Sequence, residues 1–292
     1  MNPHTHRAGF VHLIGKPNAG KSTLFNALVK QPLSIVTHKP QTTRQDLLGI
    51  VNTPHSQTIY VDTPGHIKPT YPLQKAMVKS IKRTLPGADL ILYVIDARQE
   101  LLEINSFKNL IHPTPTFLLL NKIDLLTDAI LKQKIATWSQ QANFTHTIPL
   151  SAKHHLHIDQ LTKTIEAHLP HHPPFYDKQD ITDKPIQFFI AEIIRKIIFL
   201  QYQQEVPYST SVIVTNYQEE KEMTHIEATI YTERTSQKSI LIGKQGKALE
   251  KLCVTVRKEL NHFLGQKIFF KPHIKVSPNW RKNPKIIQQW GY

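Results

Sequence analysis

A glycine-rich segment near the start of the chain has the composition of a phosphate-binding loop. Residues 15–22 read Gly-Lys-Pro-Asn-Ala-Gly-Lys-Ser and match the pattern G-x-x-x-x-G-K-[ST], between an apolar run and a helical pattern. In that context backbone N–H groups surround phosphate oxygens, a lysine reaches the β and γ phosphates, and a serine ligates Mg²⁺. The sequence therefore predicts a nucleotide site formed by Gly15, Asn18, Ala19, Gly20, Lys21, Ser22 and Thr23.

Two downstream segments complete the γ-phosphate end of such a site. Asp62-Thr63-Pro64-Gly65 follows an apolar run, which puts Asp62 where a Mg²⁺ carboxylate belongs and the Gly65 amide where it meets the γ-phosphate. Between the two motifs, residues 40–44 read Pro-Gln-Thr-Thr-Arg, and a threonine here could close over Mg²⁺ only when the γ-phosphate is present. We expect Thr43 to be that ligand, with Thr42 as the second choice.

A second pair of motifs favours guanine over adenine. Asn121-Lys122-Ile123-Asp124 follows the apolar run 116–120, and the Asp124 carboxylate can accept from both the N1–H and the 2-amino group of guanine. Adenine lacks this paired donor edge, and leaving a buried carboxylate unpaired is costly. Ser151-Ala152-Lys153 follows a later apolar run and would supply an amide to the guanine O6. We therefore expect GTP and GDP, with Mg²⁺, as ligands.

Alternating apolar runs and helical patterns position these motifs. The short apolar runs are expected to be buried strands, with helices between most of them. This alternation predicts an α/β fold with a mostly parallel sheet, whose ligands lie beyond the carboxyl ends of the strands. The expected strands are residues 10–14, 58–61, 90–95, 116–120 and 147–150.

The chain after residue 170 has a different pattern and predicts a smaller α+β domain. Pro173 and Pro174 interrupt regular structure, so we expect a nucleotide-binding domain at 1–170, a linker at 171–184, and a second domain with a tail at 185–292. The expected elements of the second domain are a helix at 185–204, strands at 208–215 and 224–232, a short strand at 240–242, a helix at 247–263 and a strand at 267–276.

Basic charge is concentrated in this second domain. The chain has a formal net charge of +14, and between residues 234 and 285 there are 13 lysines and arginines against two acidic residues, Glu250 and Glu259. Such a surplus predicts a polyanionic partner, and nucleic acid in particular. Within it, the G-x-x-G loop could approach phosphates closely, so we expect RNA to contact Gly243, Lys244, Gln245, Gly246 and Lys247.

Composition also bears on the compartment. Cys253 is the only cysteine, which favours a reducing compartment, and the polar residues 1–8 do not read as a secretory signal. The most apolar stretch, 188–200, contains three charged residues, so we expect no transmembrane segment and only peripheral membrane contact. The interpretation is a cytoplasmic monomer. Histidines at 154, 155, 157, 171 and 172 lack partners at a zinc spacing and are expected to lie in solvated segments.

The motifs at 15–22, 40–44 and 62–65, with Ile181-Thr182-Asp183 and Tyr208-Ser209, make the chain resemble the Era family of bacterial ribosome-assembly GTPases over almost its whole length. The resemblance implies a P-loop GTPase domain followed by a type II KH domain. It also implies the 3′ end of 16S ribosomal RNA as the target, within the small ribosomal subunit.

Two residues leave the mechanism open. In related GTPases an asparagine at the position of Asn18 helps to hold K⁺, which implies K⁺-stimulated hydrolysis; alternatively, Asn18 only turns the loop. The family usually has an apolar residue directly after Asp-x-x-Gly, whereas this chain has His66. His66 either positions the attacking water or points to solvent, and we favour solvent. The candidate catalytic residues are Lys21, Thr43, Gly65 and His66.

Three functions fit these patterns. The leading hypothesis is a GTPase whose nucleotide state controls RNA binding during maturation of the small (30S) ribosomal subunit. The alternative is an RNA-binding chaperone that senses GTP and hydrolyses little of it. The third hypothesis is a GTPase partner of RNA-modification enzymes. It would require further catalytic cysteines or an added domain, and Cys253 is the only cysteine in the sequence.

Overall fold

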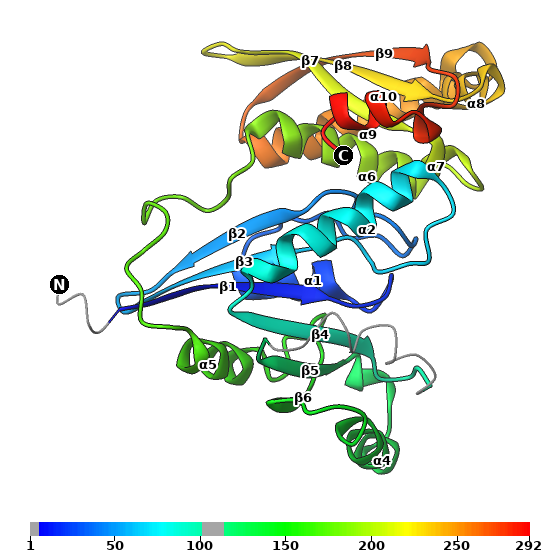
Figure 1. The fold of residues 1–292 in the computed structure, drawn as a ribbon. Coiled ribbons are helices and arrows are strands. Elements are labelled where there is room, and N and C mark those ends of the chain that lie inside the picture. Colours follow the sequence, from blue (N-terminus) through cyan, green and yellow to red (C-terminus); the bar gives the residue numbers. More distant parts are fainter. Residues whose placement is uncertain (1–5, 101–113) are drawn as a thin grey trace. The chain divides into compact units, whose positions relative to one another are not determined.

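The computed structural model describes residues 6–100 and 114–292 (Figure 1). Contacts between residues divide the chain into two units. The first unit comprises residues 1–34, 43–69 and 77–183, and the second comprises residues 35–42, 70–76 and 184–292.

The first unit is built on a six-stranded sheet with the order β2-β3-β1-β4-β5-β6. All neighbouring strands are parallel except β2, which pairs antiparallel with β3 at the edge. Every residue of β4 and β5 is buried, as expected for central parallel strands that are covered on both faces. The strands are β1 (Arg7–Ile14), β2 (Leu47–Asn52), β3 (Ser56–Asp62), β4 (Leu90–Asp96), β5 (Thr116–Asn121) and β6 (His146–Leu150).

Helices follow the strands that end at the predicted motifs. On one face, Ile81 and Leu85 pack with Trp138 against Tyr93 and Ile95 of β4. The helices are α1 (Lys21–Val29), α2 (Pro72–Thr84), α4 (Asp128–Ser139) and α5 (Ile158–His168), with short 3₁₀ turns η1 (Leu85–Gly87) and η2 (Ile123–Leu125). The α/β fold with a mostly parallel sheet is therefore confirmed.

The strand β2 was not predicted from the sequence. Gly49 lies in its interior, where a glycine weakens a strand pattern. The structure explains this glycine, because a Cβ at residue 49 would lie 2.5 Å from Val29 and 2.7 Å from the ring of Phe25. Gly49 therefore allows α1 to pack closely on the edge strand β2, and the same glycine weakens the strand pattern in the sequence.

The second unit contains a three-stranded sheet with the order β7-β8-β9, in which β7 and β8 are antiparallel and β8 and β9 are parallel. Its core joins Ile194 and Ile198 of α6, Ile226 and Ile230 of β8, and Leu252 of α9. The elements are α6 (Ile186–Gln201), α7 (Val206–Ser209), β7 (Ser211–Glu219), β8 (Met223–Thr232), α8 (Thr235–Ile242), η3 (Lys244–Gly246), α9 (Lys247–Leu264), β9 (Lys267–Val276), η4 (Trp280–Lys282) and α10 (Pro284–Gln289).

Two expected strand segments are helical instead. Residues 240–242 end α8, which begins where the Gln237 side chain accepts from the backbone N–H groups of Glu233 and Arg234. In that helix Leu241 is buried whereas Ile240 is 50% exposed. A run of three apolar residues cannot by itself distinguish a strand from a helix, which explains the error. Tyr208 and Ser209 likewise belong to the turn of α7, which Pro207 opens, rather than to β7.

His12 lies inside the first sheet, between Val61 of β3 and Ile91 of β4. Burial lowers its pKa to about 4, and its Nδ1 has no hydrogen-bond partner among the described residues. Below the ordinary pKa of 6.5 the unfolded chain binds a proton that the folded chain does not bind until the pH approaches 4. His12 therefore leaves stability intact above pH 6.5 and lowers it as the pH falls towards 4.

We predict that His12→Gln makes stability less dependent on pH between 4 and 6.5, removing a loss on the order of 3 kcal/mol. Calorimetric melting across this range measures the effect. His55→Gln, at an exposed turn, is the matched control and should retain the wild-type pH dependence. An unaltered pH dependence in His12→Gln would contradict the prediction.

Candidate nucleotide site and RNA-binding loop

The glycine-rich loop lies between β1 and α1, and Lys21 is buried at its centre. The Lys21 ammonium donates to the carbonyl oxygens of Gly15 at 3.1 Å and Lys16 at 3.0 Å. Burial lowers the pKa of Lys21 to about 8, although the nearby Asp62 carboxylate opposes this shift. The ammonium is thus held within the loop by backbone oxygens that a phosphate could replace.

A carboxylate and two hydroxyls meet beside this lysine. Asp62 has no exposed surface, and one of its oxygens accepts from Ser22 Oγ at 2.7 Å and from Ser34 Oγ at 2.8 Å. Ser22 Oγ also lies 2.8 Å from Thr43 Oγ1. Burial raises the pKa of Asp62, whereas the charge of Lys21 and the two serine hydroxyls oppose that rise.

This oxygen cluster fits the ion that the motifs imply. The second oxygen of Asp62, Oδ1, is buried without a hydrogen-bond partner among the described residues. Hydroxyl and carboxylate oxygens are the donors that Mg²⁺ prefers, and Mg²⁺ usually takes few protein ligands beside phosphates and water. Of the two candidate threonines, Thr43 lies beside Ser22, whereas the Thr42 hydroxyl bonds to Thr37 at 2.7 Å and to the Lys39 carbonyl at 2.8 Å.

The loop after β3 returns to the glycine-rich loop. The backbone N–H of His66 donates to the Gly15 carbonyl at 3.0 Å, and a Cβ at residue 65 would lie 2.8 Å from Pro17. The His66 side chain is half-buried, whereas we expected it to point to solvent. Burial, and then the charges of Lys82 and Lys21, lower the pKa of His66.

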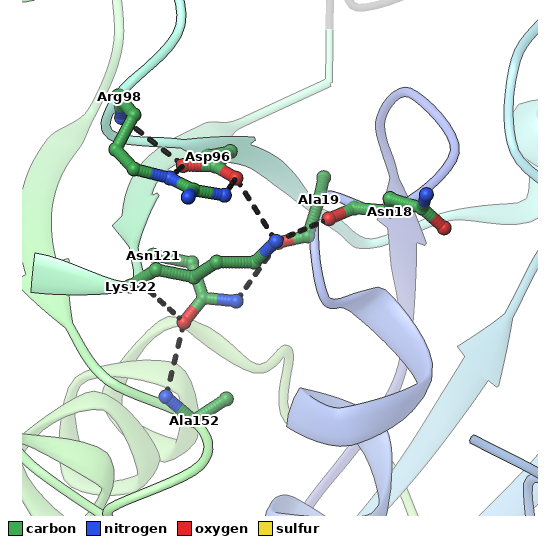
Figure 2. A network of polar contacts seen from close by, with 7 residues as sticks. All are labelled: Asn18, Ala19, Asp96, Arg98, Asn121, Lys122 and Ala152. Carbon is green, nitrogen blue, oxygen red and sulfur yellow. Dashed lines mark hydrogen bonds and ion pairs between the residues drawn. The ribbon is translucent and has the colours of Figure 1, made fainter. Parts of the chain in front are cut away.

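Asn121 connects three segments at the other end of the site (Figure 2). Its amide Nδ2 donates to the Ala19 carbonyl at 2.9 Å, and its Oδ1 accepts from the backbone N–H of Ala152 at 3.0 Å and of Lys122 at 2.8 Å. The conformation of the loop allows this approach: Gly20 has φ +95°, and a Cβ there would lie 2.2 Å from Asn121 Nδ2. The asparagine therefore holds the glycine-rich loop in place.

The structure adds Asp96 to this network, which sequence reasoning missed. Lys122 Nζ donates to Asp96 Oδ2 at 2.9 Å and to the Asn18 carbonyl at 2.6 Å, and Arg98 also binds Asp96 through Nη2 at 2.7 Å (Figure 2). Burial would raise the pKa of Asp96, but the bonds from Arg98 and Lys122 outweigh it and lower the pKa to about 2. The position of Asp96 directly after the apolar run 90–95 could have indicated its place at the site.

Asp124 and the segment 151–153 lie together, as the motif order predicts. Asp124 Oδ1 accepts from Ser151 Oγ at 2.5 Å, and His154 Nε2 lies 3.6 Å from Asp124 Oδ2. The carboxylate is thus oriented before any base binds. Lys153 is exposed, and Thr23 is half-buried in the first turn of α1.

The G-x-x-G loop joins α8 to α9 in the second unit. Gly243, Gln245 and Gly246 all have positive φ angles, of 73°, 53° and 78°. A Cβ at residue 243 would lie 2.5 Å from the Cβ of Ala248, so this turn requires a glycine. Lys244, Gln245 and Lys247 are exposed. The loop therefore offers two cations and accessible backbone to a phosphate chain.

Across residues 6–100 and 114–292, no three or more side chains of His, Cys, Asp or Glu gather in a way that could hold a metal ion. Over the same residues no helix is both long enough and apolar enough to cross a membrane.

Comparison with known proteins shows a GTPase domain and a KH domain in this chain. A family model described as 50S ribosome-binding GTPase matches residues 10–122, and a KH domain model matches residues 205–281. GTPase Era from Heliobacterium modesticaldum is 39% identical over 290 residues, covering 98% of this chain and 97% of that protein.

Two solved structures cover 98% of this chain and 99% of their own, each at 33% identity. One is Era in complex with MgGDPNP and nucleotides 1506–1542 of 16S ribosomal RNA, with a TM-score of 0.94. The other is an Era variant from Aquifex aeolicus bound to GDP·AlF₄⁻, with a TM-score of 0.93. The fold and the two sites define a P-loop GTPase with a carboxyl-terminal KH domain. The chain belongs to the Era family of GTPases.

We predict that Asp124→Asn loses GDP affinity by about 100-fold or more, because an amide N–H would replace a carboxylate oxygen opposite the guanine donors. The variant should gain affinity for xanthosine diphosphate, whose 2-oxo group accepts a hydrogen bond. Titration of both nucleotides measures the change. Asp128→Asn, an exposed residue at the start of α4, is the control. Unchanged GDP affinity in Asp124→Asn would contradict the role of Asp124.

Proposed function

We propose that the chain is a GTP-hydrolysing switch that binds 16S ribosomal RNA near its 3′ end through the KH domain and acts in maturation of the small ribosomal subunit. The observation that carries this proposal is the cluster of Ser22, Thr43 and Asp62 beside Lys21, in one chain with an exposed G-x-x-G loop. The related Era bound to a GTP analogue and to this part of 16S ribosomal RNA supports the choice of ligands.

In this proposal each residue of the site has one task. Lys21 and the backbone of residues 15–23 bind the phosphates, and Ser22, Thr43 and Asp62 hold Mg²⁺ directly or through water. Bound Mg²⁺ would neutralise charge on the β and γ phosphates. The Gly65 amide meets the γ-phosphate, while guanine is bound by Asn121, Lys122, Asp124, Ser151, Ala152 and Lys153.

Two further roles concern hydrolysis. The lowered pKa of the half-buried His66 favours the neutral imidazole, which can accept a hydrogen bond from water, so we propose His66 as the group that orients the attacking water. Asn18, which has a positive φ angle of 62° in the loop, is proposed to help hold K⁺. Equal GTP turnover in K⁺ and Na⁺ would contradict the role of Asn18 in holding K⁺. Undiminished GTP hydrolysis by His66→Ala would contradict the role of His66 in orienting water.

The wider setting is also proposed. We assign residues 1–170 to the GTPase domain, 171–184 to a linker, and 185–292 to the KH domain and tail. We further propose that the chain acts as a monomer in the cytoplasm, with peripheral contact at the cytoplasmic membrane face. Sedimentation with and without vesicles of anionic lipid tests both statements.

We predict that the protein hydrolyses GTP in repeated turnovers and crosslinks to the 3′ region of 16S ribosomal RNA. Lys244→Glu/Lys247→Glu should weaken RNA binding by about tenfold or more, since two phosphate-facing cations become anions. Lys258→Glu, also exposed but far along α9, is the control. RNA binding without measurable turnover would instead favour the RNA chaperone that senses GTP.

A buried arginine offers a route by which nucleotide state could control RNA binding. Arg195 of α6 is 1% exposed, and its Nη2 donates to the Thr42 carbonyl at 2.5 Å. Glu192 pairs with the same guanidinium through Nε at 2.8 Å. Lys39, three residues before Thr42, also donates to the carbonyl of Tyr202 at the end of α6. Thr42 is therefore fixed on the KH helix α6, and the next residue in the chain is Thr43.

We propose that movement of Thr43 upon GTP binding reaches α6 through this one peptide link. Arg195→Lys should bring the ratio of RNA affinities with a non-hydrolysable GTP analogue and with GDP closer to 1, because lysine lacks the planar fork that binds Glu192 and Thr42 together. Lys196→Ala, on a partly exposed neighbour, should keep the wild-type ratio. A wild-type ratio in a folded Arg195→Lys variant would contradict this route, and equal wild-type affinities would contradict the coupling.

A further inference from the structure

The helix α2 carries a row of cations that no function above uses. Lys75, Lys79, Lys82 and Arg83 are all exposed, and we call them the α2 basic stripe. The sequence from residue 63 to residue 88 contains no aspartate or glutamate. None of the four cations forms an ion pair with a carboxylate among the described residues.

Helical geometry places these cations on one side of α2. Lys75, Lys79 and Lys82 are four and three residues apart and share a face, and Arg83, four residues after Lys79, lies at its edge. The four cations extend over about 12 Å of the helix axis. The opposite face contains Leu73, Met77 and Ile81, which are buried. All four cations belong to the single helix α2, so the distances between them along the helix axis are set by the geometry of that helix.

Folding of the helix does not explain the stripe. Like charges three or four residues apart repel each other and destabilise a helix by some tenths of a kcal/mol per pair. Lys82 and Arg83 lie in the last turn, where the helix dipole favours cations, but Lys75 lies at the start, where it does not. The exposed helix α5 instead mixes Asp159, Lys163 and Glu166. The stripe therefore costs stability that an external anion could restore.

We propose that the α2 basic stripe binds the phosphate backbone of RNA, as a second RNA contact outside the G-x-x-G loop. The proposal rests on RNA being the partner of the KH domain. A regular row of flexible, unpaired cations matches a polyanion of regular charge, and phosphate contacts position an RNA without reading its sequence. The stripe follows the Gly65 loop in the chain, so this contact would lie on the helix nearest in sequence to the γ-phosphate motif.

The test uses Lys75→Gln/Lys79→Gln/Arg83→Gln in the full-length protein. Glutamine keeps the helix propensity of the original residues, and Lys82 is retained because its charge acts on His66. RNA affinity is measured over a series of salt concentrations with two probes, a structured fragment from the 3′ end of 16S ribosomal RNA and a short single-stranded oligonucleotide that fills only the KH loop.

For the structured fragment, the slope of log affinity against log salt concentration should become less steep by about 2 to 3, or 0.7 to 0.9 per lost phosphate contact. For the short oligonucleotide it should stay at the wild-type value. Lys30→Gln/Lys132→Gln/Lys163→Gln removes three exposed lysines elsewhere and should keep the wild-type slope for both probes. GDP affinity and the melting temperature serve as checks of folding.

A wild-type slope for the structured fragment in the α2 variant would overturn the proposal. So would an α2 variant that keeps its RNA slope but loses binding to vesicles of anionic lipid, which would assign the stripe to a membrane. If the wild-type protein binds neither probe, the RNA function of the KH domain fails, and that failure is distinct from loss of the α2 contact alone.

Discussion

The nucleotide site depends on one buried carboxylate. Asp62 ends β3 without exposed surface, where an isolated negative charge would be costly. The hydroxyls of Ser22 and Ser34 both donate to its Oδ2, and they come from the start of α1 and from the segment that precedes β2. The carboxylate thereby fixes the start of α1 against the end of β3, and its Oδ1 stays without a partner among the described residues. The charge that makes the site costly to fold is also the charge that suits it to Mg²⁺.

The parallel sheet also positions the residues at the proposed guanine end of the site. In the strand register, Asp62 lies opposite Leu13 of β1, and Asp96 lies opposite Asn121, so the carboxyl ends of four strands meet at one edge. Asn121 then holds the Ala19 carbonyl, while Lys122 connects Asp96 to the Asn18 carbonyl. Polar groups from strand ends therefore hold the glycine-rich loop on both sides, and the loop is preorganised for a phosphate chain.

Sequence reasoning selected the motif residues because each motif has a chemical task at a fixed place after a strand, and their contacts with a nucleotide stay a prediction. It predicted five of the six strands of the first sheet, since each contains a short apolar run between helical or polar segments. It missed β2, where Gly49 makes room for α1. It also predicted a strand at the end of α8, because a run of three apolar residues is too short to show the periodicity of a strand or of a helix. Asp96 escaped notice because its role depends on pairing with Lys122 from another strand, which only the fold brings about. The partial burial of His66 likewise arises from the fold and could not be predicted from the residues around it in sequence.

The central claim is that Ser22, Thr43 and Asp62 form the metal end of a GTP site. Crystals grown with a non-hydrolysable GTP analogue and Mn²⁺, which shares the preference of Mg²⁺ for oxygen ligands, test it directly through the anomalous signal of the ion. We expect a single strong peak bonded to Ser22 Oγ and Thr43 Oγ1, with Asp62 beside it. A peak bonded to neither hydroxyl, or a bound analogue with no metal at this cluster, would contradict it.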